Sequence, residues 1–206
     1  MKKHLAPLVL AALLLSACSQ ILAAAAPTLV RDPARVPAGM YAVEPDHTQV
    51  IFSVSHFGFT NYFGSFSNVS GSLSLTPKNP AAMSVSVSVP VSSVSTTSQK
   101  LNEKLVAADW LGAADYPAMV FRSTGVILTG ENTANVTGTL TLHGVTKPLT
   151  LRATFNAAGV NILDGKETVG FSLTGSLTRS DFGVGKLVPL VGDDIQLIIS
   201  AAFEKQ

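Results

Sequence analysis

The sequence predicts an all-β domain of antiparallel strands, and three features of the chain favour it. Apolar and polar residues alternate in about eight separate segments, turn-forming residues separate these segments, and charged residues make up only 13% of the 206 residues. Alternation with a period of two is typical of a strand with one buried face. Short serial strands joined by turns form an antiparallel sandwich or a barrel.

Each predicted strand carries its apolar residues on one face. Residues 83–91, MSVSVSVPV, are the clearest case, because Val85, Val87 and Val89 alternate with serines and a proline. The other predicted strands cover residues 49–57, 69–75, 119–124, 135–144, 149–155, 170–178 and 195–203.

Three glycines favour a barrel over a sandwich. Gly71, Gly138 and Gly175 lie within predicted strands, on the same faces as the large apolar residues. A glycine inside a strand often marks a bend or bulge, and a sheet needs such bends in order to close. We therefore predict an extended antiparallel eight-stranded barrel rather than a sandwich.

One segment, residues 98–117, departs from the alternation. Leu101, Leu105 and Ala108 follow one another at helical spacing, and Pro117 ends the segment. We expect one or two short helices between strands here, with Trp110 and Leu111 plugging one end of the barrel.

The N-terminal segment predicts export. Lys2 and Lys3 precede an apolar stretch, residues 5–15, and small residues follow it, which is the pattern of a signal peptide. The tetrapeptide LSAC then resembles a bacterial lipobox, in which Cys18 is lipidated. Cleavage by ordinary signal peptidase near residues 23–26 is the alternative.

Three regions follow from this pattern. Residues 1–18 are the predicted signal peptide, residues 19–39 are a linker rich in Ala and Pro, and residues 40–206 are the barrel domain. Both cleavage alternatives place the domain outside the cytoplasm, in the periplasm or cell envelope, with a lipid anchor if Cys18 is modified.

Composition and motifs weigh against several functions. The formal net charge of +1 gives no basic excess for nucleic acid, and the single cysteine excludes an intramolecular disulfide. The four histidines lack the spacing of a metal site, and no G-x-S-x-G or phosphate-binding motif is present. We expect no cofactor, no metal and no catalytic activity.

Four stretches carry a resemblance to a known family. They are YAVEPDHTQVIFSVSHFGFTNYFGSF (41–66), AADWLGAADYPAMVFRSTGV (107–126), GTLTLHGVTKPLTL (138–151) and GFSLTGSLTRSDFGVG (170–185). In their order and spacing they resemble the YceI-like family of bacterial periplasmic proteins. The resemblance implies a lipocalin-like barrel whose long apolar cavity binds isoprenoid or quinone-like lipids without catalysis.

One segment departs from the family pattern. Members commonly carry Arg-Asp-x-His-Leu before the part that matches AADWL, whereas this chain has LNEKL at residues 101–105. Asn102 and Lys104 stand where acidic and histidine residues are usual. If that cluster seats a head group or braces the helix, this protein does so differently.

The barrel prediction gives a set of candidate ligand contacts. The residues expected to line the cavity are Phe52, Val54, His56, Val85, Val87, Val89, Trp110, Phe121, Leu140, Leu142, Phe171 and Leu173.

Two of the polar residues are candidates for contact with a lipid head group. They are His56 and Arg179, and each has a structural alternative: a hydrogen-bonded core histidine, or an Arg179–Asp181 ion pair at a strand end. We expect His47 to have a structural role at a strand entrance, and His143 to lie exposed in a turn.

The expected function is binding, sequestration or transport of a long-chain isoprenoid in the envelope. A structural or stress-related envelope barrel with a filled interior and a protein partner is the alternative, and an enzyme acting on an isoprenoid is the third. The sequence also leaves a homodimer open. The size of the interior distinguishes the first two.

Overall fold

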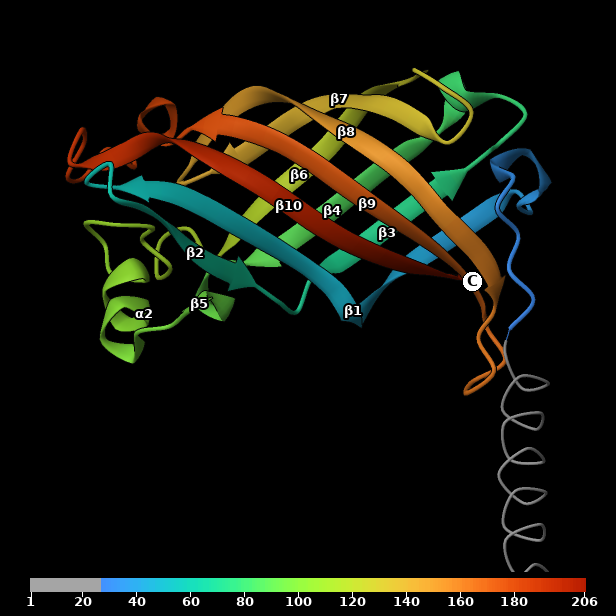
Figure 1. The fold of residues 1–206 in the computed structure, drawn as a ribbon, viewed down its shortest axis with the longest axis horizontal. Helices are drawn as coiled ribbons and strands as arrows, with labels where there is room; N and C mark the ends of the chain where they lie inside the picture. Colours follow the sequence, from blue (N-terminus) through green and yellow to red (C-terminus); the bar gives the residue numbers. More distant parts are fainter. Residues whose placement is uncertain (1–26) are drawn as a thin grey trace, which may run out of the picture.

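Eight antiparallel strands close into a barrel in the computed structural model, which describes residues 27–206. Each strand pairs with its neighbours around the barrel, and the β10–β1 pair completes the ring (Figure 1). Closure leaves no free sheet edge along the ring. In their order around the barrel, the strands are β1 (Gly39–His56), β3 (Ser70–Leu75), β4 (Ser84–Pro90), β6 (Ala118–Leu128), β7 (Thr133–Leu142), β8 (Val145–Val160), β9 (Glu167–Thr178) and β10 (Val191–Lys205).

Strand β1 bends and changes partner along its length. Its register against β10 shifts between Glu44 and Gln49, and such a bulge kinks a strand. Before the bulge β1 pairs with β3, and after it β1 pairs with β2 (Thr60–Phe66), which in turn pairs with the two-residue β5 (Ser95–Thr96).

The glycines inside the strands are sites of close approach between neighbouring backbones. A Cβ atom at Gly71 would lie 2.1 Å from the carbonyl oxygen of Ser86, and one at Gly138 would lie 2.4 Å from that of Arg122. Gly71 also has a φ of +144°, which L side chains rarely adopt. These positions therefore require glycine, and this sharpens the prediction of bends.

The two ends of the barrel differ. At one end lies the helix α2 (Gln99–Leu105), which begins where the side chain of Ser98 accepts a hydrogen bond from the Leu101 N–H, together with η3 (Val91–Ser93) and η4 (Arg179–Phe182). At the other end lie η1 (Pro33–Arg35) and η2 (Pro80–Ala82) (Figure 1). The apolar core consists of three clusters inside the barrel. They are centred on Tyr41 and Phe203, on Leu151 and Phe182, and on Phe66 and Val69.

The prediction of an all-β eight-stranded barrel is confirmed, and all eight predicted segments lie in strands of the ring. Strand β2 was missed. Its outward residue Phe63 is aromatic and exposed, which hides the alternation of polar and apolar residues there.

The N-terminal predictions fall partly outside the structure. The signal peptide, Cys18 and residues 19–26 lie outside the described residues. The remainder of the predicted linker does not hang free, since Val30 forms a β-bridge with Ala158 and Val36 is buried. In the described part of the chain, no helix is long and apolar enough to cross a membrane.

Candidate functional site

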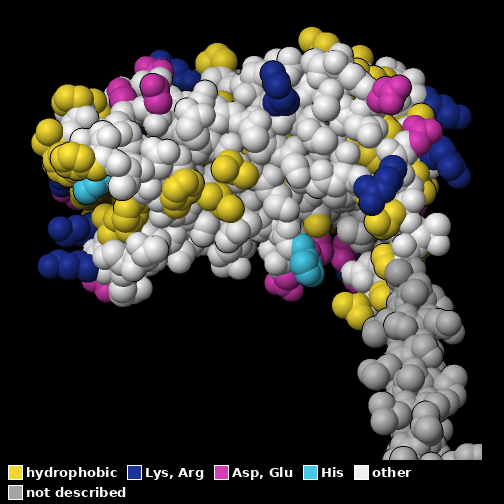
Figure 2. Space-filling view, viewed as in Figure 1, with side chains coloured by type: hydrophobic (Ala, Val, Ile, Leu, Met, Phe, Trp, Pro, Cys, Tyr) yellow, Lys and Arg dark blue, Asp and Glu magenta, His cyan; other side chains and the backbone are white. Residues whose placement is uncertain are grey.

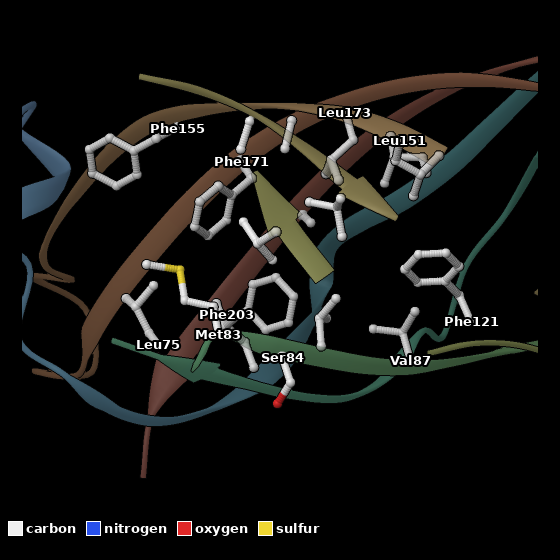
Figure 3. Close-up of a pocket in the computed structure, with 18 of the residues that line it drawn as sticks. Leu75, Met83, Ser84, Val87, Phe121, Leu151, Phe155, Phe171, Leu173 and Phe203 are labelled. Carbon is white, nitrogen blue, oxygen red and sulfur yellow. The ribbon is translucent and has the colours of Figure 1, made fainter. Parts of the chain in front are cut away.

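The barrel encloses a cavity of about 860 Å³, which is near the upper end of the roughly 300–1,000 Å³ typical of ligand pockets. All eight strands of the ring contribute side chains to its wall. Figure 3 shows Phe155, Phe171 and Leu173 facing Leu75 and Met83 across it. The interior of this barrel is therefore hollow rather than filled by its own side chains.

The cavity reaches the barrel end that carries η1 and η2. We call this end the mouth, and its residues are Arg31, Asp32, Pro33, Pro77, Pro80, Glu131 and Asn132. At the opposite end, Phe52 packs on Phe66 with ring centroids 5.5 Å apart, and Leu105 and Leu111 pack against the same cluster. That end is closed by apolar side chains.

Polar groups divide the site into a polar mouth and an apolar interior. Among the described lining residues, the charged ones are Arg31, Asp32 and Glu131, all at the mouth. Deeper in the wall, Thr48 is polar, but its hydroxyl already donates to the carbonyl of Ala202 (3.3 Å) and accepts from the Ala202 N–H (3.0 Å). The interior therefore suits a hydrocarbon chain, and the mouth suits a polar group.

Eight of the predicted lining residues lie together in the cavity wall. They are Val85, Val87, Val89, Phe121, Leu140, Leu142, Phe171 and Leu173. Each belongs to a strand in which alternation places every second side chain inside the barrel. Their contact with a ligand stays a prediction.

Three apolar residues do not line the cavity as expected. Phe52 points inward but fills the closed end against Phe66. Val54, two residues further along β1 on the same face, is buried and also lies outside the cavity wall. Trp110 is half-buried at that end, where the Lys186 ammonium is 5.2 Å from its ring centroid. Leu111 packs inside instead, against two core clusters.

Both candidate head-group residues lie away from the cavity. His56 is exposed at the end of β1, and its ring meets that of Phe57 edge to face, with ring centroids 4.6 Å apart. Its regular pairing with Thr60 of β2 keeps His56 on the same face as Val54, but at the exposed end of the strand and away from the cavity.

Arg179 instead has a structural role, because its side chain binds backbone carbonyl groups. It is 7% exposed, and its guanidinium donates to the carbonyl oxygens of Val184, Lys186, Val191 and Gly192 at 2.6–2.9 Å. Burial lowers the pKa of Arg179. The expected Arg179–Asp181 pair is absent from the ion pairs of residues 27–206, in which Asp193 instead accepts hydrogen bonds from Ser180.

Two other histidines occupy structural positions. His143 is half-buried rather than exposed, because its ring packs on Tyr116 and its Nδ1 lies 3.3 Å from the Phe182 carbonyl oxygen. His47 is exposed and binds the carboxylate of Glu44 at 2.7 Å. Neither lines the cavity.

Comparison with known proteins identifies the family. The sequence model of the YceI-like domain matches residues 41–203. The protein belongs to the YceI-like family. A UPF0312 protein of Pseudomonas putida strain W619 is 39% identical to it over 141 residues, which cover 68% of this chain and 73% of the relative.

Solved structures of YceI-like and related proteins share the barrel. BcnA of Burkholderia cenocepacia is 25% identical with a TM-score of 0.70, over 78% of this chain and 98% of BcnA. The YCEI protein of Campylobacter jejuni is 30% identical with a TM-score of 0.65, over 74% and 90%. A polyisoprenoid binding domain from Saccharophagus degradans has the same fold at 15% identity, with a TM-score of 0.63, over 81% and 98%.

The unusual LNEKL segment of this YceI-like barrel braces the closed end. The side-chain oxygen of Asn102 accepts hydrogen bonds from the backbone N–H (2.8 Å) and hydroxyl (2.7 Å) of Thr96 on β5, while Lys104 is exposed. No residue of the segment lines the cavity. In this chain the segment therefore braces the helix at the end opposite the mouth.

The polar mouth residues were missed by sequence reasoning. Arg31 and Asp32 lie in a segment without alternation, and Glu131 and Asn132 lie in the turn between the predicted strands 119–124 and 135–144. The turn signal at residues 130–132 does place polar groups at the end of two inward-facing strands. A search of strand ends for charge would have found Glu131.

Proposed function

We propose that this YceI-like protein binds one long-chain isoprenoid, or a similar amphiphilic lipid, and performs no chemistry on it. The observation that carries the proposal is the apolar cavity of about 860 Å³ inside the barrel, whose charged lining residues, among those that the structure describes, all lie at the mouth. The solved polyisoprenoid binding domain with the same fold supports the ligand class. The hollow interior disfavours the alternative of a filled structural barrel.

The cavity volume sets a length for the buried chain. A methylene group occupies about the volume of a water molecule in the liquid, roughly 30 Å³. A cavity of about 860 Å³ then holds on the order of 30 carbon atoms, or about six isoprene units. A longer chain would leave its remainder at the mouth.

Burial of such a chain gives a useful affinity. At about 0.3 kcal/mol per heavy atom for large ligands, 30 carbon atoms contribute about 9 kcal/mol, which corresponds to a Kd below about 1 μM. The gain comes from removing hydrocarbon from water, at roughly 0.8 kcal/mol per methylene before the costs of binding.

The head group is expected at the mouth. Arg31 is exposed there, and a guanidinium presents several N–H donors in a fork that suits a phosphate or carbonyl oxygen. The carboxylate of Asp32 already accepts one hydrogen bond within the protein, from the Ala34 N–H (2.9 Å). Arg31 is therefore the head-group contact we propose in place of His56 and Arg179.

The cell envelope is the proposed location. Lys2, Lys3 and the apolar stretch 5–15 support export, and the LSAC sequence supports lipidation of Cys18. Labelling cells with palmitate tests the anchor, with Cys18→Ser as the control. Label on the wild type alone supports a lipoprotein, and no label on the wild type removes it.

Mass spectrometry of the purified protein tests the ligand. The protein is extracted with organic solvent, and we expect about one long-chain isoprenoid for each protein molecule. Protein free of lipid, which also fails to take up an added isoprenoid, would refute the proposal. An isoprenoid that is chemically altered after incubation would instead indicate an enzyme.

A further inference from the structure

An exposed apolar surface surrounds the turn between β8 and β9. We call it the hairpin tip surface, and it consists of Leu29, Val160, Ile162 and Leu163, whose exposed fractions are 47%, 55%, 58% and 89%. Leu29 contacts β8, since a Cβ atom at Gly159 would lie 3.4 Å from its side chain. None of these side chains belongs to the cavity wall.

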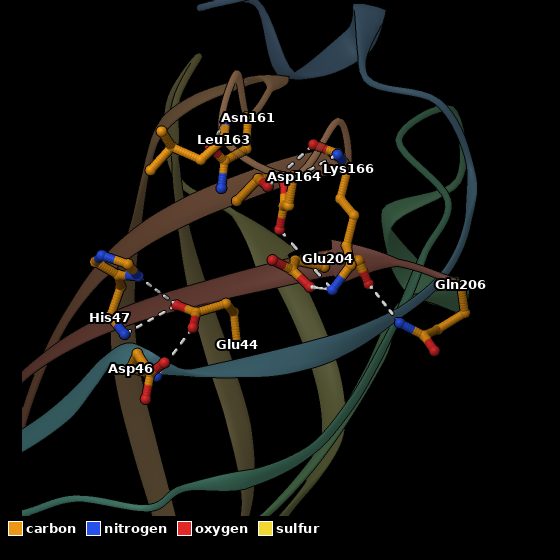
Figure 4. A network of polar contacts seen from close by, with 10 residues as sticks. Glu44, Asp46, His47, Asn161, Leu163, Asp164, Lys166, Glu204 and Gln206 are labelled. Atoms are coloured by element: carbon orange, nitrogen blue, oxygen red, sulfur yellow. Dashed lines mark hydrogen bonds and ion pairs between the residues drawn. The ribbon is translucent and has the colours of Figure 1, made fainter.

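Hydrogen bonds brace the backbone of this turn. The Asn161 side chain accepts a hydrogen bond from the Leu163 N–H (3.0 Å), and the backbone of Asn161 bonds to Lys166 and Gly165 (2.8 Å each). The Lys166 ammonium binds Glu204 on β10 at 2.5 Å (Figure 4). A rigid turn with an exposed leucine loses little conformational entropy on docking.

The hairpin tip surface lies at the same end of the barrel as the mouth. The last pair of β7 and β8 joins Thr133 to Thr154, so β8 continues six residues further to Val160, an overhang of about 20 Å. In Figure 1 the β8–β9 connection projects from the end that carries η1, and Figure 2 shows hydrophobic side chains exposed at this end. The tip therefore lies beside the mouth and extends beyond the β6–β7 turn there.

The N-terminal segment limits how far the mouth end of the barrel can lie from a lipid anchor on Cys18. Val30 and Ala158 exchange two backbone hydrogen bonds (2.7 and 2.8 Å), and Cys18 lies twelve residues before Val30. Twelve extended residues reach at most about 40 Å. A lipid on Cys18, or the apolar stretch 5–15 itself, would hold the hairpin tip surface near a bilayer.

We propose that the hairpin tip surface docks on a lipid bilayer and turns the mouth of the cavity towards it. An isoprenoid then passes between membrane and barrel without crossing water. This docking rests on the proposed envelope location and lipid ligand.

The size of the surface favours a bilayer over a protein. Four side chains cannot bury the roughly 800 Å² per partner that a stable protein interface needs. They can enter the upper 5–10 Å or so of a bilayer, where interfacial apolar residues lie. The nearest charges do not oppose this, because Lys166 is paired with both Asp164 and Glu204.

Tryptophan quenching tests the docking on the full-length chain. In a Trp110→Phe background, Leu163→Trp places the one tryptophan at the tip, and Phe59→Trp places it at the opposite end. Phe59 is the matched control because its exposed fraction is 87%, against 89% for Leu163. The protein is mixed with phosphatidylethanolamine and phosphatidylglycerol vesicles whose acyl chains carry bromine.

We expect a blue shift and about a twofold loss of emission for Leu163→Trp, and neither change for Phe59→Trp. The same loss of emission in both variants on adding vesicles, including no loss in either, would overturn the docking. Quenching of Phe59→Trp alone would also overturn it. An unquenched Leu163→Trp together with a dimer that Leu163→Ser dissociates would assign the surface to a second copy of the chain.

Transfer kinetics link the docking to the cavity. Ile162→Ser with Leu163→Ser should slow the movement of a fluorescent isoprenoid from vesicles to the protein by about tenfold, with the amount bound at equilibrium unchanged. Phe59→Ser should leave both unchanged, and an unaltered rate in the double variant would contradict the role in loading. The quenching experiment needs no isoprenoid, so its result bears on membrane docking alone. The docking can therefore be refuted while the proposed lipid ligand stands, and the reverse.

Discussion

Val87→Arg is the sharpest test of the cavity as a lipid site. Val87 lies on β4 between Gly71 of β3 and Phe121 of β6, and it packs against all three core clusters. Its side chain therefore points into the middle of the cavity, away from the mouth (Figure 3). An arginine there places a charge where a hydrocarbon chain would lie.

The expected loss of affinity is large. Covering an unpaired charge with hydrocarbon costs several kcal/mol in real proteins, and about 4 kcal/mol is a conservative value. This corresponds to roughly a thousand-fold weaker binding. A ligand with a Kd below about 1 μM would then no longer copurify. Solvent extraction and mass spectrometry of the purified variant measure this directly.

The control for Val87→Arg is the neighbouring residue on the opposite face of β4. Ser88 lies between Ser70 and Val120 in the sheet and does not line the cavity. Ser88→Arg should keep its lipid, and circular dichroism should show that both variants are folded. A folded Val87→Arg protein that carries a full complement of lipid would refute the assignment of this face to the ligand.

Three further predictions follow from the same structure. Ala153→Phe projects a ring into the cavity wall and should shorten the longest bound chain by about one isoprene unit; unchanged chain lengths in a lipid series would contradict the volume limit. Arg179→Lys cannot supply the donors that reach four carbonyl oxygens, so urea denaturation should show a free energy of unfolding lower by about 3 kcal/mol, with lipid binding retained; loss of lipid from the folded variant would restore Arg179 as a head-group contact. Burial, with the charge of Glu167, raises the pKa of Tyr41 from 10.0 to about 12. The stability that its neutral form contributes is therefore complete below about pH 10 and is lost as the pH rises to about 12. Tyr41→Phe should remove that step from the profile of unfolding free energy against pH, and an identical profile would contradict it.

Strand pattern and barrel closure were predictable from local sequence. Alternation at Val85, Val87 and Val89 shows which face is buried, because side chains of a strand alternate between two faces. The in-line glycines Gly71 and Gly138 indicated where strands approach closely, and both positions lack room for a Cβ atom. The same local rules could not show how far along the barrel a given inward residue lies.

That position along the barrel decided the site residues. Val50 and Phe52 share a face of β1, yet Val50 lines the cavity while Phe52 fills the closed end against Phe66. Arg179 follows an alternating strand, but its role depends on carbonyl groups of residues 184–192 that fold back over it. Contacts between distant segments set these roles, and alternation carries no information about them.

The sequence by itself determined an all-β chain with one apolar face on each strand and glycines where strands must approach. Only the tertiary structure decided that those faces enclose a space of about 860 Å³, with Arg31 at its mouth and the hairpin tip surface beside it. The physical reason is that burial from water dictates which side chains turn inward. Whether they then meet one another or leave room for a ligand depends on the width and stagger of the closed barrel.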